Sequence, residues 1–264
     1  MNIFRLLVIS ILFSVNIYSF ASDDVQVTIF VHGTRRLSKL FLKYTTKENK
    51  ITNVKDLPTS CKVTRSMSKT LEKVDSNNFA KEQFYVFGWS GKLSHKARVQ
   101  AASIFHDQIL KLVEDLKKQN INPVINIITH SHGGNVVLNM ASLDLNNKLT
   151  INNLILLACP VQEHTRKLVN HDLFKNVYNI YSTLDSLQIL DPQGLHAEHQ
   201  GKKVPFFSQR TFDTNTNLKQ AKIKIRNCGV THSGFLMPRF FKRLPVLLDK
   251  MKQSPCDSVA FIKI

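Results

Sequence analysis

The sequence has few acidic residues and little glycine or proline. Its 264 residues include 19 Asp and Glu against 36 Lys and Arg, which gives a formal net charge of +17 at pH 7. Only 9 Gly and 8 Pro are present, which excludes collagen-like and Pro/Gly-rich low-complexity architectures. We find no repeat at a period of roughly 20 to 50 residues, which excludes a solenoid or a propeller. Apolar residues make up 43% of the chain, enough for a sizeable core in one large domain or two small ones.

Long apolar runs are also scarce, and the single one lies at the N-terminus. Arg5 is the only charged residue before Asp23, an apolar run follows it, and Ser19-Phe20-Ala21 places small residues where a signal peptidase reads them. An uncleaved anchor helix is the alternative, but the run is short for the roughly 20 residues of a membrane span. The sequence therefore predicts a signal peptide over residues 1–21, cleavage after Ala21, and a secreted or periplasmic protein formed by residues 22–264.

The cysteines are few and contain no C-x-x-C pair, so neither a zinc ribbon nor a thioredoxin-like redox site is predicted. An exported protein folds in an oxidising compartment, which favours at least one disulfide. The four cysteines are Cys61, Cys159, Cys228 and Cys256. They allow three full pairings, and the sequence does not choose among these pairings. Cys159 ends an apolar run and could instead be a buried thiol.

The apolar segments alternate between continuous runs and helical periodicity. We expect strands over Val25–Val31, Phe84–Phe87, Pro123–Ile128, Leu154–Ala158, Val177–Tyr181 and, as the last strand, Ala221–Arg226; we expect helices over Arg98–Lys118, Asn135–Leu143 and Arg239–Lys252. Continuous apolar strands alternating with helices indicate an α/β fold, with a mostly parallel central sheet flanked by helices on both faces. Residues 35–83 are long for a connection and could form a flap or insertion over the site, or a helix and a surface loop.

A candidate nucleophile lies between a predicted strand and a predicted helix. Thr129-His-Ser-His-Gly133 matches the G-x-S-x-G elbow, in which a tight turn lifts the central serine above the sheet, except that Thr129 replaces the first glycine. Gly133 and Gly134 supply the small residues that the turn needs on its other side. We therefore interpret Ser131 as the nucleophile.

A serine needs a base, and the base needs a partner that orients it. Asp185 and His232 each follow a predicted strand, in the chain order serine, acid, histidine that this arrangement uses. We predict that His232 takes the proton from Ser131 and that Asp185 holds His232. Alternatives remain for the acid in Asp191 and Asp213, and for the base in His196 and His199.

A developing oxyanion needs two backbone N–H donors. His32-Gly33 closes the first predicted strand, and we expect the N–H of Thr34, or that of Gly33, to be one donor. The N–H of His132, directly after the serine, is predicted to be the other.

Together these motifs resemble the α/β-hydrolase superfamily, in particular its lipase- and esterase-like serine hydrolases. The resemblance covers nearly all of residues 22–264, which we expect to form a single α/β-hydrolase domain. It includes a Trp-Ser-Gly turn at Trp89 ahead of a helix, although Trp89 itself is expected to pack in the core. It implies a Ser-Asp-His hydrolase of carboxylic esters, lipid esters among them, with no cofactor. Two alternatives stay open: cleavage of thioesters or amides, and a binding protein on the same scaffold without turnover.

The remaining features concern partners. His32, His130 and His132 flank the site, but side chains that flank an elbow serine point apart, so no metal site is expected. Residues 201–264 hold 13 Lys and Arg against 3 Asp and Glu without any nucleic-acid-binding motif. No nucleic-acid partner is therefore expected. The basic region is either a solvated surface or a peripheral contact with an anionic membrane, and the sequence does not define an oligomeric state.

Overall fold

A computed structural model describes residues 24–34, 45, 47–144, 149–190, 207–213, 216–225, 227–255 and 259–263. The predicted signal peptide lies outside these residues. So do four of the side chains discussed above: Asp191, His196, His199 and Cys256.

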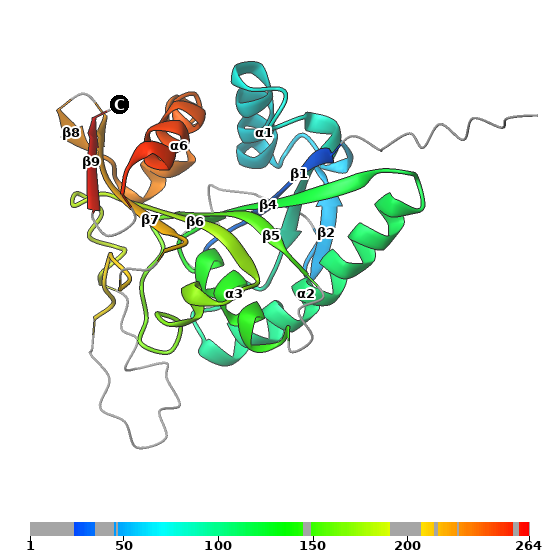
Figure 1. Ribbon diagram of the computed structural model, residues 1–264, viewed down its shortest axis with the longest axis horizontal. Helices are drawn as coiled ribbons and strands as arrows, with labels where there is room; N and C mark the ends of the chain where they lie inside the picture. The colour runs from blue at the N-terminus through cyan, green and yellow to red at the C-terminus, as the bar shows by residue number, and fades with distance from the viewer. Residues whose placement is uncertain are drawn as a thin grey trace, which may run out of the picture.

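The centre of the molecule is a sheet in the order β2-β3-β1-β4-β5-β6-β7-β8, with β9 also paired to β7 (Figure 1). All neighbouring strands run parallel except β2 against β3 and β8 against β7. The strands are β1 (Asp24–Val31), β2 (Lys50–Asn53), β3 (Phe84–Gly88), β4 (Asn122–His130), β5 (Ile151–Leu157), β6 (Phe174–Tyr181), β7 (Leu218–Ile225), β8 (Cys228–Gly229) and β9 (Val259–Lys263).

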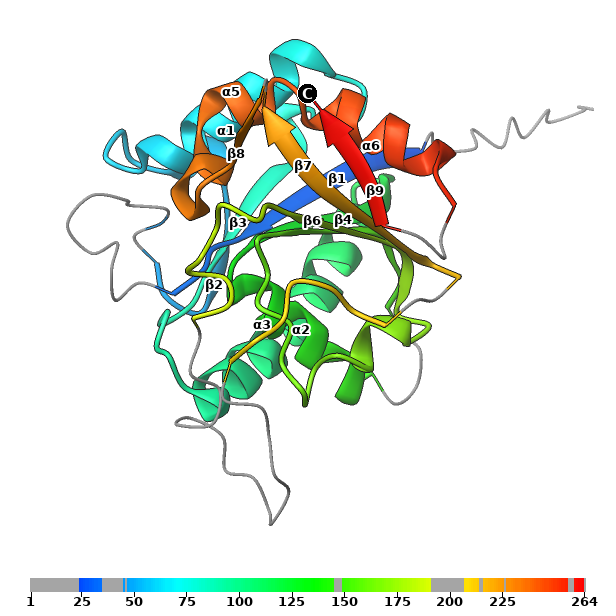
Figure 2. The same cartoon turned by 90° about the vertical axis from the view of Figure 1, so that its left-hand side faces the viewer.

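Helices cover both faces of the sheet (Figures 1 and 2). On one face lie α2 (His95–Lys117) and α3 (Gly133–Asn139), and on the other α1 (Lys62–Val74), α5 (Pro238–Phe241) and α6 (Leu244–Gln253). Short 3-10 helices are η1 (Val54–Asp56), η2 (Lys81–Gln83), η3 (Met140–Ser142), η4 (Leu168–Asn170) and η5 (His232–Leu236). The predicted fold class, a mostly parallel sheet flanked on both faces, is confirmed.

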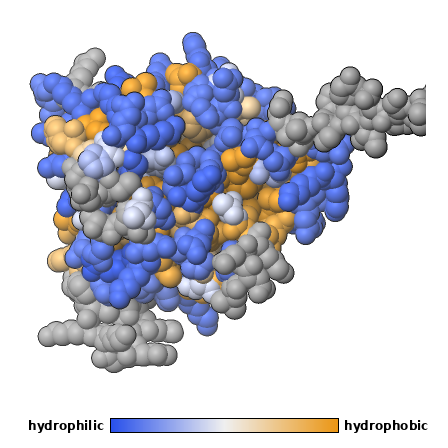
Figure 3. All heavy atoms as spheres, viewed as in Figure 1, coloured by the Kyte–Doolittle hydropathy of each residue, from blue (hydrophilic) through white to orange (hydrophobic). Residues whose placement is uncertain are grey.

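Each helical layer forms because apolar residues recur at helical spacing. In α2, Phe105 and Ile109 lie four residues apart and are fully buried against the sheet. In α1, Met67 and Leu71 have the same spacing and pack in the cluster on the opposite face. Polar residues cover most of the face shown in Figure 3, and the main group of apolar residues lies to the right of its middle. The apolar faces of these helices pack on the sheet and form two buried apolar clusters, one on each side of it.

The C-terminal third differs from the sequence prediction in two ways. Ala221–Arg226 was expected to be the last strand, but β9 lies beyond it and pairs in parallel with β7. The single closing helix expected over Arg239–Lys252 is divided into α5 and α6, with Pro245 in the first turn of α6. A proline lacks the N–H that a helix interior needs but is tolerated in the first turn, so a new helix begins beside it.

The described part of residues 35–83 belongs to the sheet and the helical layers. Residues 50–53 add the antiparallel edge strand β2, and residues 62–74 form α1. Residues 35–44 and 46 lie outside the described part. Among the described residues, no helix is long and apolar enough to span a membrane.

Three of the four cysteines lie within the described residues. Cys61, Cys159 and Cys228 form no disulfide with one another. Each of the three full pairings would require a bond between two of these three cysteines, so no full pairing is present. Cys61 and Cys159 are buried, and Cys159 packs against the turn described next.

Candidate functional site

Ser131 occupies a strained turn between β4 and α3. It is not glycine, yet its φ is 52°, in the left-handed region that L-residues rarely adopt. Its backbone N–H donates to the carbonyl of Leu157 at the end of β5, at 2.9 Å, which holds the turn on the sheet. A strained strand-to-helix turn of this kind is the nucleophile elbow. The predicted elbow geometry is therefore present.

Two glycines allow α3 to begin this close to the sheet. A Cβ on Gly133 would collide with the carbonyl of Val31 on β1, and a Cβ on Gly134 would collide with the sulfur of Cys159. These positions must therefore lack a side chain because neighbouring backbone and side-chain atoms occupy the space.

Thr129 departs from the usual glycine but fits the site. Its side chain is fully buried, and its hydroxyl donates to the carbonyl of Ile155 on the adjacent strand β5, at 3.3 Å. The hydrogen bond compensates for burying the polar group. The turn at Ser131 forms with threonine in this position.

Asp185 and His232 lie in direct contact although 47 residues separate them. The Nδ1 atom of His232 is 2.7 Å from Oδ2 of Asp185, and the carboxylate is fully buried. The other oxygen, Oδ1, accepts the backbone N–H of Gln188 at 3.1 Å. Arg210 donates to the main-chain carbonyl of Asp185 at 2.8 Å. Both carboxylate oxygens are therefore hydrogen-bonded, and the carboxylate is oriented towards the ring of His232.

The alternative acid Asp213 takes no part in this contact. Its side chain is 66% exposed and forms an ion pair with Arg166 at 2.9 Å.

Sequence reasoning missed Gln188 and Arg210 as supports of Asp185. The spacing of three residues between Asp185 and Gln188 is a usable pattern, because an aspartate commonly accepts a backbone N–H a few residues further on.

The end of β1 lies against Ser131. A Cβ placed on Gly33 would be 2.7 Å from Cβ of Ser131 and 2.9 Å from the carbonyl oxygen of His130. The loop carrying Thr34 therefore begins beside the serine, and the Thr34 hydroxyl is buried without a hydrogen-bond partner among the described residues. His132 is the N-cap of α3, and the first N–H groups of a helix have no partner inside it. Of the candidate donors, Gly33 therefore lies beside Ser131, and His132 follows Ser131 directly in the chain.

His32 anchors that loop to the neighbouring strand. Its ring is fully buried and stacks on Trp89, with ring centroids 5.9 Å apart. The Nδ1 atom lies 2.7 Å from the carbonyl of Gly33, whereas Nε2 accepts the backbone N–H of Trp89 at 3.3 Å. Trp89 returns a bond from its indole N–H to the carbonyl of His32, at 2.7 Å. Trp89 is thus fully buried and bound to His32 at the end of β1.

His130 and His132 point to different partners. His130 Nε2 lies 2.9 Å from the carbonyl oxygen of His232, and His132 Nδ1 lies 3.4 Å from the amide of Asn135. Burial, together with the nearby rings of His232 and His32, holds the pKa of His130 well below its usual value. Across the part of the chain that the structure describes, no three His, Cys, Asp or Glu side chains are grouped as metal ligands.

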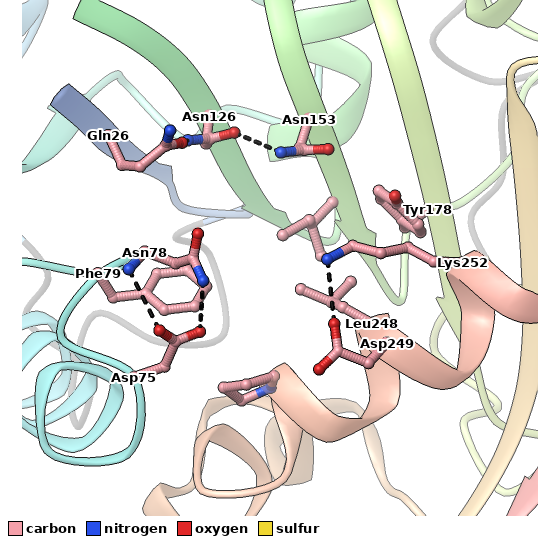
Figure 4. Close-up of a pocket in the computed structure, with 12 residues that line it drawn as sticks. Gln26, Asp75, Asn78, Phe79, Asn126, Asn153, Tyr178, Leu248, Asp249 and Lys252 are labelled. Carbon is pink, nitrogen blue, oxygen red and sulfur yellow. Dashed lines mark hydrogen bonds and ion pairs between the residues drawn. The ribbon is translucent and has the colours of Figure 1, made fainter. Parts of the chain in front are cut away.

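A pocket of about 50 Å3 lies elsewhere, between α1, α6 and the sheet (Figure 4). Its floor is a row of carboxamides in which Asn126 donates to Gln26 at 2.8 Å and accepts from Asn153 at 2.6 Å. None of the candidate site residues lines it, so we do not assign the substrate to it.

The turn at Ser131, the strand order and the contact between Asp185 and His232 in the loops that follow the strands together define the architecture. The chain has the α/β-hydrolase fold. No protein-family model matches it, and no curated protein matches its sequence.

Among solved structures, the fold is similar to three hydrolases. Aspergillus fumigatus lipase B is 13% identical (TM-score 0.45), with 92% of this chain and 56% of the lipase covered. A predicted CIB-like hydrolase from Thermoplasma acidophilum is 14% identical (TM-score 0.41), with 86% and 87% covered. Phospholipase PlaB from Legionella pneumophila, in complex with thio-NAD, is 20% identical (TM-score 0.34), with 52% of this chain and 25% of the phospholipase covered. The chain thus matches about a quarter of the length of PlaB and about half that of the lipase.

Proposed function

We propose that this protein is a serine hydrolase of carboxylic esters that works through Ser131, His232 and Asp185. The observation that carries the proposal is the 2.7 Å contact between a buried carboxylate and the Nδ1 atom of His232. It occurs at the edge of the sheet where Ser131 is held at φ 52°. A carboxylate that accepts Nδ1–H leaves Nε2 of the imidazole free to act as a base.

The proposed reaction has two steps. Ser131 Oγ attacks the acyl carbonyl while His232 Nε2 takes its proton, and the negative oxygen is bound by the N–H groups of His132 and of Gly33 or Thr34. The same proton passes to the leaving alcohol, which gives an acyl-enzyme. Water, deprotonated by His232, then hydrolyses the acyl-enzyme and restores the serine. Asp185 stabilises the imidazolium in both steps, and no cofactor is required.

A lipid ester is the substrate class that we favour. Among the described residues, eight large apolar side chains are exposed. Five of them, 45 to 55% exposed, lie in or beside the segments that carry the acid and the base: Leu184, Leu187, Leu190, Phe207 and Met237. Residues 207–213, which include Phe207, are tied to the Asp185 loop through the bond from Arg210 to the Asp185 carbonyl. Exposed apolar side chains gathered around a site favour contact with lipid.

The positive charge of the chain supports the same choice. A formal net charge of +17 attracts an anionic bilayer, by about 1 kcal/mol for each Lys or Arg close to its surface. We therefore propose a peripheral contact with an anionic membrane. Separately, the signal-peptide pattern leads us to propose that residues 1–21 direct export of the protein. Thioester or amide cleavage is the alternative reaction on the same residues.

Labelling with a fluorophosphonate probe tests the proposed nucleophile. The wild-type protein should label, whereas Ser131→Ala and His232→Ala should not. Ser233→Ala is the control, because it removes an exposed hydroxyl beside the base and should label normally. A folded wild-type protein that does not label would contradict the proposal and favour a binding protein on a hydrolase scaffold.

Vesicle binding tests the substrate class. Leu187→Asp and Leu190→Asp should weaken cosedimentation with vesicles of phosphatidylglycerol and phosphatidylcholine, and should slow hydrolysis of vesicle-bound esters. Val246→Asp, at a similarly exposed position on α6, should change neither. Hydrolysis of a short soluble ester should be equal in all three variants. Equal vesicle binding by all three would refute the lipid contact, while the esterase assignment would stand.

A further inference from the structure

His130, the residue before the nucleophile, contacts the proposed base in two ways. Its Nε2 atom lies 2.9 Å from the main-chain carbonyl oxygen of His232. Its ring also packs against the ring of His232, with centroids 4.6 Å apart and planes inclined at 53°. The side chain is part of neither the nucleophile nor the acid–base pair.

The carbonyl partner determines the tautomer of His130. A carbonyl oxygen can only accept, so the Nε2 atom of His130 must carry the hydrogen. The surroundings favour the neutral form of the His130 ring. Burial disfavours a positive charge on it, and so do the neighbouring rings of His232 and His32. Nδ1 is then unprotonated. It faces Gly33, where a Cβ would lie 3.3 Å from it.

Two other hydrogen bonds hold the backbone near His232. The N–H of Val230 donates to Oγ of Ser182 at 2.8 Å, and the N–H of Gly234 donates to the carbonyl of Thr231 at 2.9 Å. His232 is the first residue of the five-residue η5, and Thr231 before it makes no side-chain capping hydrogen bond. Asp185 fixes the far end of the His232 side chain at Nδ1. The bond from His130 to the His232 carbonyl fixes its main chain, so the two contacts together limit both position and rotation of the imidazole.

We propose that His130 is a positioning residue for the general base: its Nε2–H holds the His232 carbonyl, and its uncharged ring supports the His232 imidazole as that imidazole gains a proton. The proposal rests on the function proposed above, in which His232 becomes an imidazolium during acyl transfer. A charged ring 4.6 Å away would oppose that step, whereas a neutral one does not. Because His130 adjoins Ser131 in the chain, it also links the nucleophile turn to the start of η5.

Two variants separate positioning from packing. His130→Gln keeps an N–H donor near the position of Nε2, and His130→Leu fills similar space without a donor. We expect His130→Leu to lower the rate of fluorophosphonate labelling and the kcat for a soluble ester about tenfold, which corresponds to one lost hydrogen bond of roughly 1.4 kcal/mol. KM should change little, and His130→Gln should recover most of the rate. His106→Leu is the control: it removes another buried histidine, bonded to Asp144 away from the site, and should label at the wild-type rate.

Nitrogen-15 NMR of the histidine rings reads the tautomer directly and does not depend on turnover. We expect His130 to be neutral at pH 7 and to carry its hydrogen only on Nε2, because burial holds its pKa well below the usual value. A doubly protonated ring, or a hydrogen on Nδ1, would overturn the proposal. Wild-type labelling by His130→Leu would overturn the positioning role alone, whereas a wild-type protein that does not label would overturn the proposed function and the role together.

Discussion

Replacing Asp185 with asparagine should nearly abolish acyl transfer while leaving the fold in place. Asparagine has the same size, and its carbonyl oxygen can still accept the backbone N–H of Gln188, a bond that is 3.1 Å long in the native protein. The charge next to His232 is lost. The amide can also donate to Nδ1, which would favour the tautomer that carries its hydrogen on Nε2 and cannot act as a base.

The size of the effect follows from the geometry. The carboxylate is fully buried and its Oδ2 lies 2.7 Å from Nδ1 of a ring that is 19% exposed. Two unit charges with centres about 4 Å apart attract by about 4 kcal/mol at an effective dielectric constant of about 20. Since about 1.4 kcal/mol is a factor of ten, losing this attraction to the imidazolium should slow acyl transfer about a thousandfold. The wrong tautomer would add to the loss.

Stopped-flow hydrolysis of a p-nitrophenyl ester, with thermal unfolding of the same samples, measures both quantities. Asp213→Asn is the matched control, because Asp213 was the rival acid in the sequence and its carboxylate is exposed beside Arg166. We expect the control to retain activity within about twofold, as exposed ion pairs contribute little. A loss below tenfold for Asp185→Asn, with the fold intact, would refute the view that this carboxylate supports a catalytic imidazolium.

Four further predictions concern single positions. Gly33→Ala should block fluorophosphonate labelling, because its methyl group would lie 2.7 Å from Cβ of Ser131; normal labelling would show that the loop is free to move away. Thr129→Gly, although it restores the common elbow residue, should destabilise the protein by roughly 1–3 kcal/mol in chemical denaturation, because it removes a buried hydrogen bond and leaves a void. Thr34→Val should leave the melting temperature unchanged or raised, because the native hydroxyl is buried without a partner; a lower melting temperature would reveal a bond to that hydroxyl. Because the pKa of His130 is held well below its usual value, the unfolded state binds the extra proton, so stability should fall as the pH drops below about 6.5, by at most about 1.4 kcal/mol per pH unit, and His130→Gln should weaken this dependence in unfolding curves from pH 7 to pH 5.

Local sequence patterns were sufficient for most of the strands and for the nucleophile turn. The apolar runs of β1, β4 and β6 lie where they were expected, because a strand covered on both faces needs apolar residues at successive positions. The apolar pattern did not reveal β2, which has four residues, or β9, which has five residues and lies beyond α6. Short edge strands carry little periodicity and depend on the neighbour that they pair with.

The order serine, acid, histidine could be read along the chain, because parallel strands place their following loops at one edge of the sheet. Ser131, Asp185 and His232 were therefore identifiable as candidates from position and residue type alone. Only the tertiary structure separated Asp185, buried and in contact with His232, from the exposed Asp213. That choice depends on burial and on distances between segments far apart in sequence, which local spacing does not encode.

The sequence by itself determined the alternation of strands and helices, the glycines that the turn at Ser131 requires and the chemical types of the candidate site residues, because each of these depends on neighbours within a few residues. The tertiary structure decided which carboxylate meets His232, how a threonine is accommodated at position 129, and that His130 holds the main chain of His232. These are contacts between strands and loops separated by 26 to 102 residues. Such contacts form only when the whole sheet packs, since the free energy that selects them comes from the burial of both apolar layers rather than from any one segment.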